Sequence, residues 1–442
     1  NMPFILPANT LSAGGYDVDN SLRFNSASSD SLTRTTSGAG TSNQKFTMSL
    51  WIKKSSTDSA VRRLIELYNT SSYYVSFRFR DDSSNRLDFY SESNGSSVNL
   101  RTNRSFRDLS AWYHLMMVVD TTLATADDRM KMYVNGVQET SFALRTNFGS
   151  NENINFNNSG DGQYIARAVG TETDRMFNGY MSEVCFIDGL ALAADSFGEF
   201  DEDSGIWKPI NVSGLTFGDN GFYLETKQSG TSQNSSGLGA DTSGNDNHFA
   251  VNNLTAVDQS TDTCTNNFAV GNPLVQNDLP AFSNGNLTYT SGSNNYKTGL
   301  STIGVSSGKW FMEVLFVSGS TAIIGVVDEA DFGSLNGNTA GAGFTTNSVG
   351  YYKDGTKWIA DSESSYGASY AADDTIGIAL DLDSGTKTVT FYKDGASQGA
   401  INLPTTGTGT FFFAPGAFNG VLSANYGSPP YAISSGNTDP NG

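Results

Sequence analysis

Carboxylates at alternate positions are the first arrangement in this sequence that could perform chemistry. The run EFDED (199–203) places Glu199, Asp201 and Asp203 two residues apart, a spacing that directs side chains to one face of a strand. Retaining glycoside hydrolysis needs two carboxyl groups about 5–5.5 Å apart. The run, however, follows a stretch that predicts a short helix and then a loop, and Glu202 breaks the alternation. Because charge runs usually form solvated faces, the sequence favours an acidic turn without catalytic function.

A general base is scarce, because the chain contains only two histidines. His114 lies within the predicted strand WYHLMM, and His248 opens a second predicted strand beside a loop. The chain has no CxxC pair and no HExxH motif, which argues against zinc. Its glycine-rich stretches lie between strands, where glycine is merely permissive, and none precedes a helix as a phosphate loop would. We therefore predict that the protein is not an enzyme and has no catalytic residues.

Oxygen-rich loops leave calcium open as a cofactor, and we expect no other. The candidate ligands are Asp120, Asp127 and Asp128 around a predicted hairpin, and Asp241 and Asp246 in DTSGNDN. None of these acids has the spacing of an EF-hand loop.

Aromatic side chains are candidates for binding, because sugars and partner proteins both contact Trp and Tyr. Alternation buries half of the side chains in a strand, so most strand aromatics, including Tyr73 and Tyr74, are expected in a core. Tyr366 and Tyr370 lie in the loop-like stretch DSESSYGASYAADD beside acids, and are better surface candidates.

Composition indicates which elements must position these residues. A chain of 442 residues is too long for one ordinary core, so two domains are expected. Its 47 glycines, 12% aromatic and 16% charged residues predict an all-β, turn-rich protein. The net charge of −19 argues against nucleic acid and anionic lipid as partners. No run of about 18 apolar residues occurs, so no membrane insertion is expected. Cys185 and Cys264 are expected to be buried and do not form a disulfide framework.

Short strands with period-two alternation recur along both halves of the chain. Their spacing, without a long helical period, predicts two antiparallel β-sandwiches. The best helix candidate is residues 190–200, residues 226–247 read as loop or linker, and residues 248–258 as one further strand. The predicted strands are 46–54, 73–80, 86–92, 112–120, 129–139, 163–169 and 179–188 in the first block, and 309–317, 321–328, 350–358, 375–383, 387–395, 411–418 and 421–427 in the second.

Three hairpin-like sequences resemble one another: KMYVNGVQE (131–139), GYYKDGTKW (350–358) and VTFYKDGASQ (389–398). Asn-Gly and Asp-Gly are favoured where a two-residue type I′ turn requires positive φ at both central residues. The strands before these turns differ in length and apolar pattern. Turn stereochemistry therefore explains the likeness better than internal duplication does.

In the first block, FTMSLWIKK, WYHLMMVVD with RMKMYVNGVQE, and MFNGYMSEVCFIDGLAL occur in the order typical of laminin G-like domains. About residues 20–195 resemble this family, which belongs to the concanavalin A-like lectin/glucanase superfamily. The resemblance implies an antiparallel sandwich and a packed, structural His114 at the W-x-H position. It also implies a calcium ion held at one rim by loop Asp side chains and carbonyl oxygens.

In the second block, SGKWFMEVLF, IGVVDEADF, GYYKDGTKW, DTIGIALDLDSGTKTVTFYKDGASQGAI, FFFAPGAF and ANYG resemble a SPRY domain over about residues 300–427. SPRY domains build their recognition surface from loops at one end of the sandwich. The resemblance therefore predicts a ligand-binding patch from residues 328–334, 351–358 and 364–370. Its members would be Asp328, Asp331, Tyr351, Tyr352, Trp358, Tyr366 and Tyr370.

The opening FILPANTLSAGGYDVDNSLRFN and the connector GIWKPINVSGLTFGDNGFYLETKQSG, together with both modules, resemble surface proteins of tailed, marine-type bacteriophages. The resemblance implies a non-enzymatic virion surface component, assembled in the bacterial cytoplasm as a head decoration, fibre or tail protein. It would be a homo-oligomer, with a trimer favoured, that attaches to other virion proteins and presents its sandwiches to host-surface glycan or protein. A purely structural decoration protein and, less favoured, a carbohydrate-active enzyme remain as alternatives. The predicted organisation is a docking arm (1–19), a laminin G-like sandwich (20–205), a connector (206–265), a SPRY-like sandwich (266–435) and a polar tail (436–442).

Overall fold

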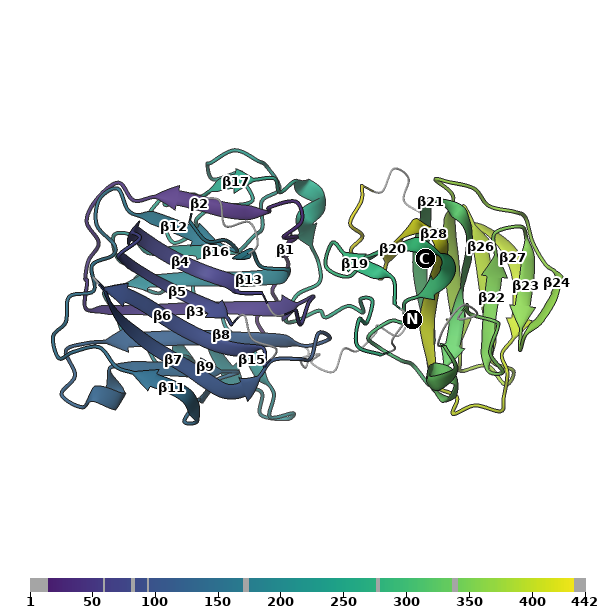
Figure 1. Cartoon of the computed structure of the whole chain (residues 1–442), viewed down its shortest axis with the longest axis horizontal. Helices are drawn as coiled ribbons and strands as arrows, with labels where there is room; N and C mark the ends of the chain where they lie inside the picture. The colour runs from purple at the N-terminus through teal and green to yellow at the C-terminus, as the bar shows by residue number, and fades with distance from the viewer. Residues whose placement is uncertain are drawn as a thin grey trace. The chain divides into compact units, whose positions relative to one another are not determined.

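The structure is a computed structural model that describes residues 15–58, 60–80, 84–93, 95–169, 175–275, 279–335 and 341–432. Most of the predicted docking arm 1–19 and all of the polar tail 436–442 lie outside these residues. The chain divides in sequence between Asn267 and Phe268 into two compact units, each drawn in Figure 1. Strands dominate both units and pair antiparallel, which confirms the predicted all-β fold class. No helix in the described part of the chain is long and apolar enough to cross a membrane.

The first unit is a sandwich of two eight-stranded sheets, here named sheet A and sheet B. Sheet A has the order β10 (Val137–Gln138), β9 (Met130–Val134), β8 (Trp112–Asp120), β3 (Lys45–Lys54), β13 (Gly179–Asp188), β1 (Ser21–Phe24) and β18 (Gln259–Ser260), with β16 (Phe222–Leu224) also paired to β13. Sheet B has the order β11 (Phe142–Thr146), β7 (Ser96–Ser105), β6 (Arg86–Ser93), β5 (Tyr73–Phe79), β4 (Arg62–Thr70), β12 (Gly162–Ile165), β2 (Ser31–Thr35) and β17 (Ala250–Asn252).

The core between sheets A and B follows directly from period-two alternation. Phe46 and Met48 of β3 and Phe77 and Phe89 of β5 and β6 are wholly buried in one cluster, and the rings of Phe46 and Phe89 lie 6.2 Å apart. Because these positions face inward, their neighbours in sequence face away from the core on the outer side of each sheet. The outer sides of the two sheets therefore carry the candidate sites described below.

Residues 206–265 are part of the first unit and do not form the separate connector that the sequence predicted. They supply β16, β17 and β18 to the two sheets, and β15 (Trp207–Pro209) pairs with β14 (Gly198–Phe200) in a small hairpin. Phe222 and Phe249 are wholly buried in the core. These strands have two or three residues each, which is too few to show a hydrophobic period between polar runs. The composition of the segment alone therefore predicts a linker.

The predicted helix at 190–200 is also wrong. The structure has only the short 3-10 helix η3 (Ala194–Ser196), after which the chain enters β14. Among the residues that the structure describes, further 3-10 helices are η1 (Ala126–Asp128), η4 (Ala256–Asp258) and η5 (Glu329–Ser334). Of the predicted strand at 248–258, only Ala250–Asn252 forms a strand, β17, and residues 256–258 form η4. Cys185 and Cys264, both in the first unit, are buried and unpaired as expected.

The second unit is one ten-stranded antiparallel sheet that folds around its own core. The two halves of the 20-residue strand β21 have different neighbours: Lys309–Leu315 pairs with β25 (Thr375–Asp381), and Ile323–Val327 pairs with β22 (Ser348–Tyr352). The remaining strands are β19 (Ala281–Ser283), β20 (Thr288–Thr298), β23 (Thr356–Ile359), β24 (Ser362–Ser365), β26 (Thr388–Lys393), β27 (Ala396–Asn402) and β28 (Phe411–Asn425).

Two of the three hairpin sequences form the predicted two-residue turn. Asn135 and Gly136 have φ values of 47° and 75°, and Asp394 and Gly395 have 48° and 80°. The third hairpin has three residues between β22 and β23, and of these only Gly355 has positive φ. The three similar sequences therefore form two different turn geometries, and they lie in two different units.

Candidate functional site

The outer side of sheet B carries half-buried tyrosines on neighbouring strands, named here the tyrosine face: Tyr68 on β4, Tyr74 on β5, Tyr90 on β6 and Tyr164 on β12. Tyr68 lies directly opposite Tyr74 in the strand register, with ring centroids 6.3 Å apart. The rings of Tyr74 and Tyr90 lie 5.7 Å apart on a diagonal. Leu67, Val75 and Phe89, their neighbours in sequence, lie in the core. Alternation thus gathers these rings on the side that faces away from the core.

Paired charges lie beside the tyrosine face on the same side of sheet B. Asp88 is wholly buried, and its carboxylate accepts hydrogen bonds from Nε of Arg78 at 2.9 Å and of Arg101 at 3.2 Å. The Arg78 guanidinium lies over the ring of Tyr90, 4.4 Å from its centroid. Burial lowers the pKa of Arg78, while Asp88 opposes that shift and keeps the guanidinium charged.

A second ion pair, Arg63 with Glu66 at 3.1 Å, lies on the neighbouring strand β4. The Arg63 guanidinium lies 5.8 Å from the ring centroid of Tyr74. On β7 the buried Oδ1 of Asn99 has no hydrogen-bond partner among the described residues. The tyrosine face therefore combines flat apolar rings with fixed, planar hydrogen-bonding groups. Such a surface can stack against an apolar ligand face and bind hydroxyl groups beside it.

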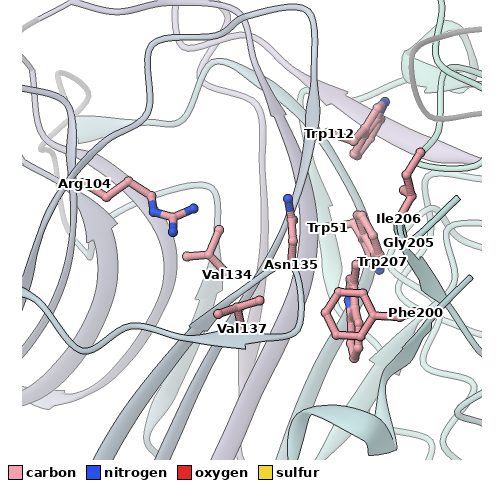
Figure 2. Close-up of a pocket in the computed structure, with 10 residues that line it drawn as sticks. All are labelled: Trp51, Arg104, Trp112, Val134, Asn135, Val137, Phe200, Gly205, Ile206 and Trp207. Atoms are coloured by element: carbon pink, nitrogen blue, oxygen red, sulfur yellow. The ribbon is translucent and has the colours of Figure 1, made fainter.

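The outer side of sheet A carries a second feature, an aromatic pocket of about 380 Å³. Figure 2 shows its lining residues, which come from β3, β8, the β9–β10 hairpin and the β14–β15 hairpin, with Arg104 added from β7 of sheet B. Trp207 is packed so tightly that a Cβ atom on Gly136 would lie 2.2 Å from its ring. The glycine of the Asn-Gly turn is thus required both by its positive φ and by this close approach. The lining residues are Trp51, Arg104, Trp112, Val134, Asn135, Val137, Phe200, Gly205, Ile206 and Trp207.

His114 packs against Trp207 in the wall of the pocket. It is wholly buried, and its ring is stacked on Trp207 at 5.9 Å. Trp207 Nε1 donates to His114 Nδ1 at 3.0 Å, so Nε2 carries the ring proton and donates to Ser49 Oγ at 2.8 Å. Burial lowers the pKa of His114 to about 3, so the imidazole is neutral at physiological pH. The expected packed, structural histidine is confirmed.

Two of the alternating acids of EFDED, Glu199 and Asp201, have partners within the protein. Glu199 is exposed in β14 and pairs with Lys208 at 3.2 Å. Asp201 is buried, and its Oδ1 accepts hydrogen bonds from the backbone N–H groups of Asp203 and Ser204, which closes the β14–β15 turn. The predicted acidic turn is confirmed, as the turn of a hairpin.

The predicted calcium ligands have protein partners of their own. Asp120 pairs with Lys45 at 3.0 Å, Asp127 with Arg145 at 3.0 Å and Asp128 with Lys131 at 3.5 Å. Asp241 accepts backbone hydrogen bonds from Tyr223 and Asn247, whereas Asp246 is 91% exposed beside His248. Among the residues that the structure describes, no three His, Cys, Asp or Glu side chains gather as a metal site. The structure thus does not bring the predicted ligands together.

In the second unit, four residues of the predicted ligand patch are internal. Tyr351 and Tyr370 lie in the core, because strand alternation and the loop after β24 turn their rings inward. Asp328 is buried and accepts backbone hydrogen bonds from Ala330, Thr408 and Gly409. Asp331 is buried and binds the backbone and side chain of Asn347. Their prediction as ligand-contacting residues is therefore wrong: both acids fix loops.

The other three predicted residues are half-buried. The Tyr366 hydroxyl donates to the carbonyl of Gly399, and Lys357 lies over its ring at 5.4 Å. Tyr352 and Trp358 belong to an outer aromatic cluster, linked through Tyr296 and Phe344 by ring contacts of 4.8–6.4 Å. The structure does not gather the seven predicted residues into one patch.

Sequence reasoning missed most of the tyrosine face and all of the aromatic pocket. Of the tyrosine face it considered only Tyr74, and expected it in a core. The signal was present in YYVSFRFR and RLDFYSE, where Tyr, Arg and Asp alternate with Val, Phe and Leu. No pattern linked Trp207 to Trp51 and Trp112, which are far apart in sequence and meet only after the β14–β15 hairpin packs on sheet A.

Comparisons with known proteins agree with this architecture. Residues 25–195 match the family described as the concanavalin A-like lectin/glucanases superfamily, so the first unit contains a laminin G-like, lectin-type sandwich. No curated protein sequence matches the chain.

Several solved structures are similar to parts or most of this chain. A human SPRY domain is 21% identical and covers 32% of this chain and 92% of its own, with a TM-score of 0.26. A putative carbohydrate binding protein from Bacteroides ovatus is 15% identical over 54% of this chain and 59% of its own, with a TM-score of 0.36. Domains LG4-5 of the mouse laminin alpha1 chain are 10% identical over 95% of this chain and 92% of their own, with a TM-score of 0.32.

Proposed function

We propose that the protein is a non-enzymatic glycan-binding protein and that the tyrosine face is its binding surface. The observation that carries this proposal is the combination of Tyr68, Tyr74 and Tyr90 with the ion pairs beside them. Pyranose rings present apolar C–H faces that stack on aromatic rings, and their hydroxyl groups both donate and accept hydrogen bonds. A lectin-type sandwich in the first unit supports a binding role.

A glycan array probed with the full chain tests the proposal, followed by affinity measurements on any glycan that binds. Tyr74→Ala and Tyr90→Ala each remove one ring of the tyrosine face, and we expect each to weaken binding by about tenfold or more. Tyr392→Ala is the matched control, because Tyr392 is a half-buried strand tyrosine of the second unit with its own ring contact to Phe311. Its affinity should equal that of the unaltered chain. An array without any bound glycan, or equal affinities for all three variants, would refute the proposal.

We further propose that this glycan-binding chain is displayed on the surface of a bacteriophage particle. The support is the resemblance of the opening and connector sequences to phage surface proteins. In that setting the N-terminal arm attaches an oligomer, with a trimer favoured, to other virion proteins, and the first unit contacts host-surface glycan. Many copies on one particle make modest single-site affinity sufficient for attachment.

A purely structural decoration protein is the competing function. Immunogold labelling of purified particles locates the protein and reports its copy number. Particles that lack the chain should lose adsorption to host cells under the display hypothesis. Unchanged adsorption with reduced particle stability would favour the structural alternative.

A further inference from the structure

The aromatic pocket on sheet A is not used by the proposed glycan site, which lies on the opposite side of the sandwich. It extends into solvent as an apolar surface, because Val137 and Phe200 at its mouth are 54% and 50% exposed. Trp51, Trp112 and Trp207 form its buried wall. Large exposed apolar side chains that continue into a pocket are typical of sites where a partner inserts an anchoring side chain.

The tryptophan rings of the wall present mainly carbon to the pocket, while Arg104 and Asn135 add polar atoms to its lining. Trp112 Nε1 donates to Asp262 at 3.0 Å, and Trp207 Nε1 donates to His114 at 3.0 Å, so both indole N–H groups are already bonded within the protein. Val134 and Ile206 add further apolar surface. A volume of about 380 Å³ lies at the lower end of the range of ligand pockets, which suits one or two large apolar side chains.

The charge at the mouth of the pocket is negative. Glu202 and Asp203 lie in the turn between Phe200 and Gly205, both exposed, and neither forms an ion pair with another described residue. Across the mouth, Arg104 is compensated by Glu139 at 2.8 Å. The two uncompensated carboxylates, on a chain of net charge −19, favour a cationic neighbour for whatever enters the pocket.

We infer that the aromatic pocket binds a peptide segment of a partner protein in which one large apolar side chain is flanked by Lys or Arg. The apolar side chain fills the space between Trp51, Trp207 and Phe200. The flanking cations lie against Glu202 and Asp203 at the lip. This second interaction surface goes beyond glycan binding and is independent of it.

Fluorine NMR of the full chain labelled with 5-fluorotryptophan tests the inference. Three of the five tryptophans line the pocket, whereas Trp310 and Trp358 lie in the second unit and serve as internal controls. The probes are blocked pentapeptides: Gly-Lys-Phe-Lys-Gly, Gly-Lys-Ala-Lys-Gly and Gly-Glu-Phe-Glu-Gly. We expect saturable shifts of the pocket resonances with the first peptide, none with the second, and weaker binding of the third.

Two sets of variants separate the apolar anchor from the charged lip. Phe200→Ala should abolish the shifts caused by Gly-Lys-Phe-Lys-Gly. Combining Glu202→Gln with Asp203→Asn should weaken that peptide on the order of fivefold and remove the preference over Gly-Glu-Phe-Glu-Gly. Leu144→Ala, an exposed residue on β11 outside the pocket, is the control and should change nothing. Absence of shifts with every peptide, equal binding of cationic and anionic peptides, or shifts of Trp310 and Trp358 alone would overturn the inference.

Discussion

At the scale of single residues, Glu183 is the most unusual side chain of the first unit. It is buried in a bulge of β13 with a positive φ of 51°, and its carboxylate accepts hydrogen bonds from the hydroxyls of Tyr16 and Tyr223. Burial, followed by the nearby charge of Glu225, raises the pKa of Glu183 to about 7, although the tyrosine hydrogen bonds oppose this shift. The carboxyl group therefore titrates near neutral pH in the folded chain and near its ordinary pKa when unfolded.

This raised pKa predicts a pH-dependent stability. Because the folded state holds the proton more tightly, the stabilisation is complete below about pH 4.5 and is lost as pH rises to about 7. The loss is about 3 kcal/mol in unfolding free energy, because the pKa rises from its ordinary value of 4.5 to about 7. Denaturant unfolding of the first unit between pH 4 and pH 8 measures it. Glu183→Gln should flatten the profile, whereas Glu202→Gln, at an exposed position, should leave the pH profile unchanged; a steep profile in Glu183→Gln would contradict the assignment.

At the scale of elements, the segment 259–267 is fastened to sheet A by a buried ion pair. Lys53 on β3 is wholly buried, and its ammonium donates to Asp262 at 2.8 Å and to Asn267 at 2.7 Å. Asp262 also accepts the indole N–H of Trp112. Burial lowers the pKa of Lys53, while Asp262 opposes that shift. One carboxylate thus joins β3, β8 and the end of the first unit.

Removing that carboxylate should unfold the first unit at lower denaturant concentration. Asp262→Ala removes the carboxylate that faces the buried Lys53 ammonium, and we expect a loss of about 3–5 kcal/mol in unfolding free energy. Asp203→Ala, which removes an exposed carboxylate, should cost less than about 0.5 kcal/mol. The measurement is denaturant unfolding, monitored separately for each unit. Equal midpoints for both variants would show that the ion pair does not hold the segment.

Elements and sites were not equally predictable from the sequence. The long strands carry a clear period, so β3, β8, β13 and β25 follow from the sequence alone, and His114 was correctly placed as a packed residue. Two- and three-residue strands carry no period, which is why 206–265 read as a linker. The ligand patch failed at Tyr351 and Tyr370 because aromatic residues suit a core and a binding surface equally well. Which of the two holds depends on the strand register, and only the fold supplies it.

At the scale of the whole molecule, the boundary between the two units cannot be found from the composition of the chain. A fragment that ends at residue 205 would lack β16, β17 and β18 as well as Asp262. Phe222 and Phe249 would be missing too, so the core residues that they cover would be exposed. A fragment of residues 15–267 retains all of them.

We therefore expect the fragment 15–267 to be soluble with a cooperative thermal transition, and the fragment 15–205 to aggregate or to lack one. Circular dichroism with thermal melting compares the two, and the fragment 268–432 should melt independently of either. A cooperative transition in 15–205 would show that residues 206–267 are dispensable, contrary to their place in both sheets.

The two unpaired cysteines can be used to measure opening of the first unit. Cys185 and Cys264 are buried in it, and burial raises the pKa of both thiols well above the ordinary value, so neither forms a reactive thiolate while the unit is folded. The second unit has no cysteine. The rate of alkylation by a thiol reagent therefore measures how often the lectin-type sandwich opens, and it is not affected by opening of the second unit.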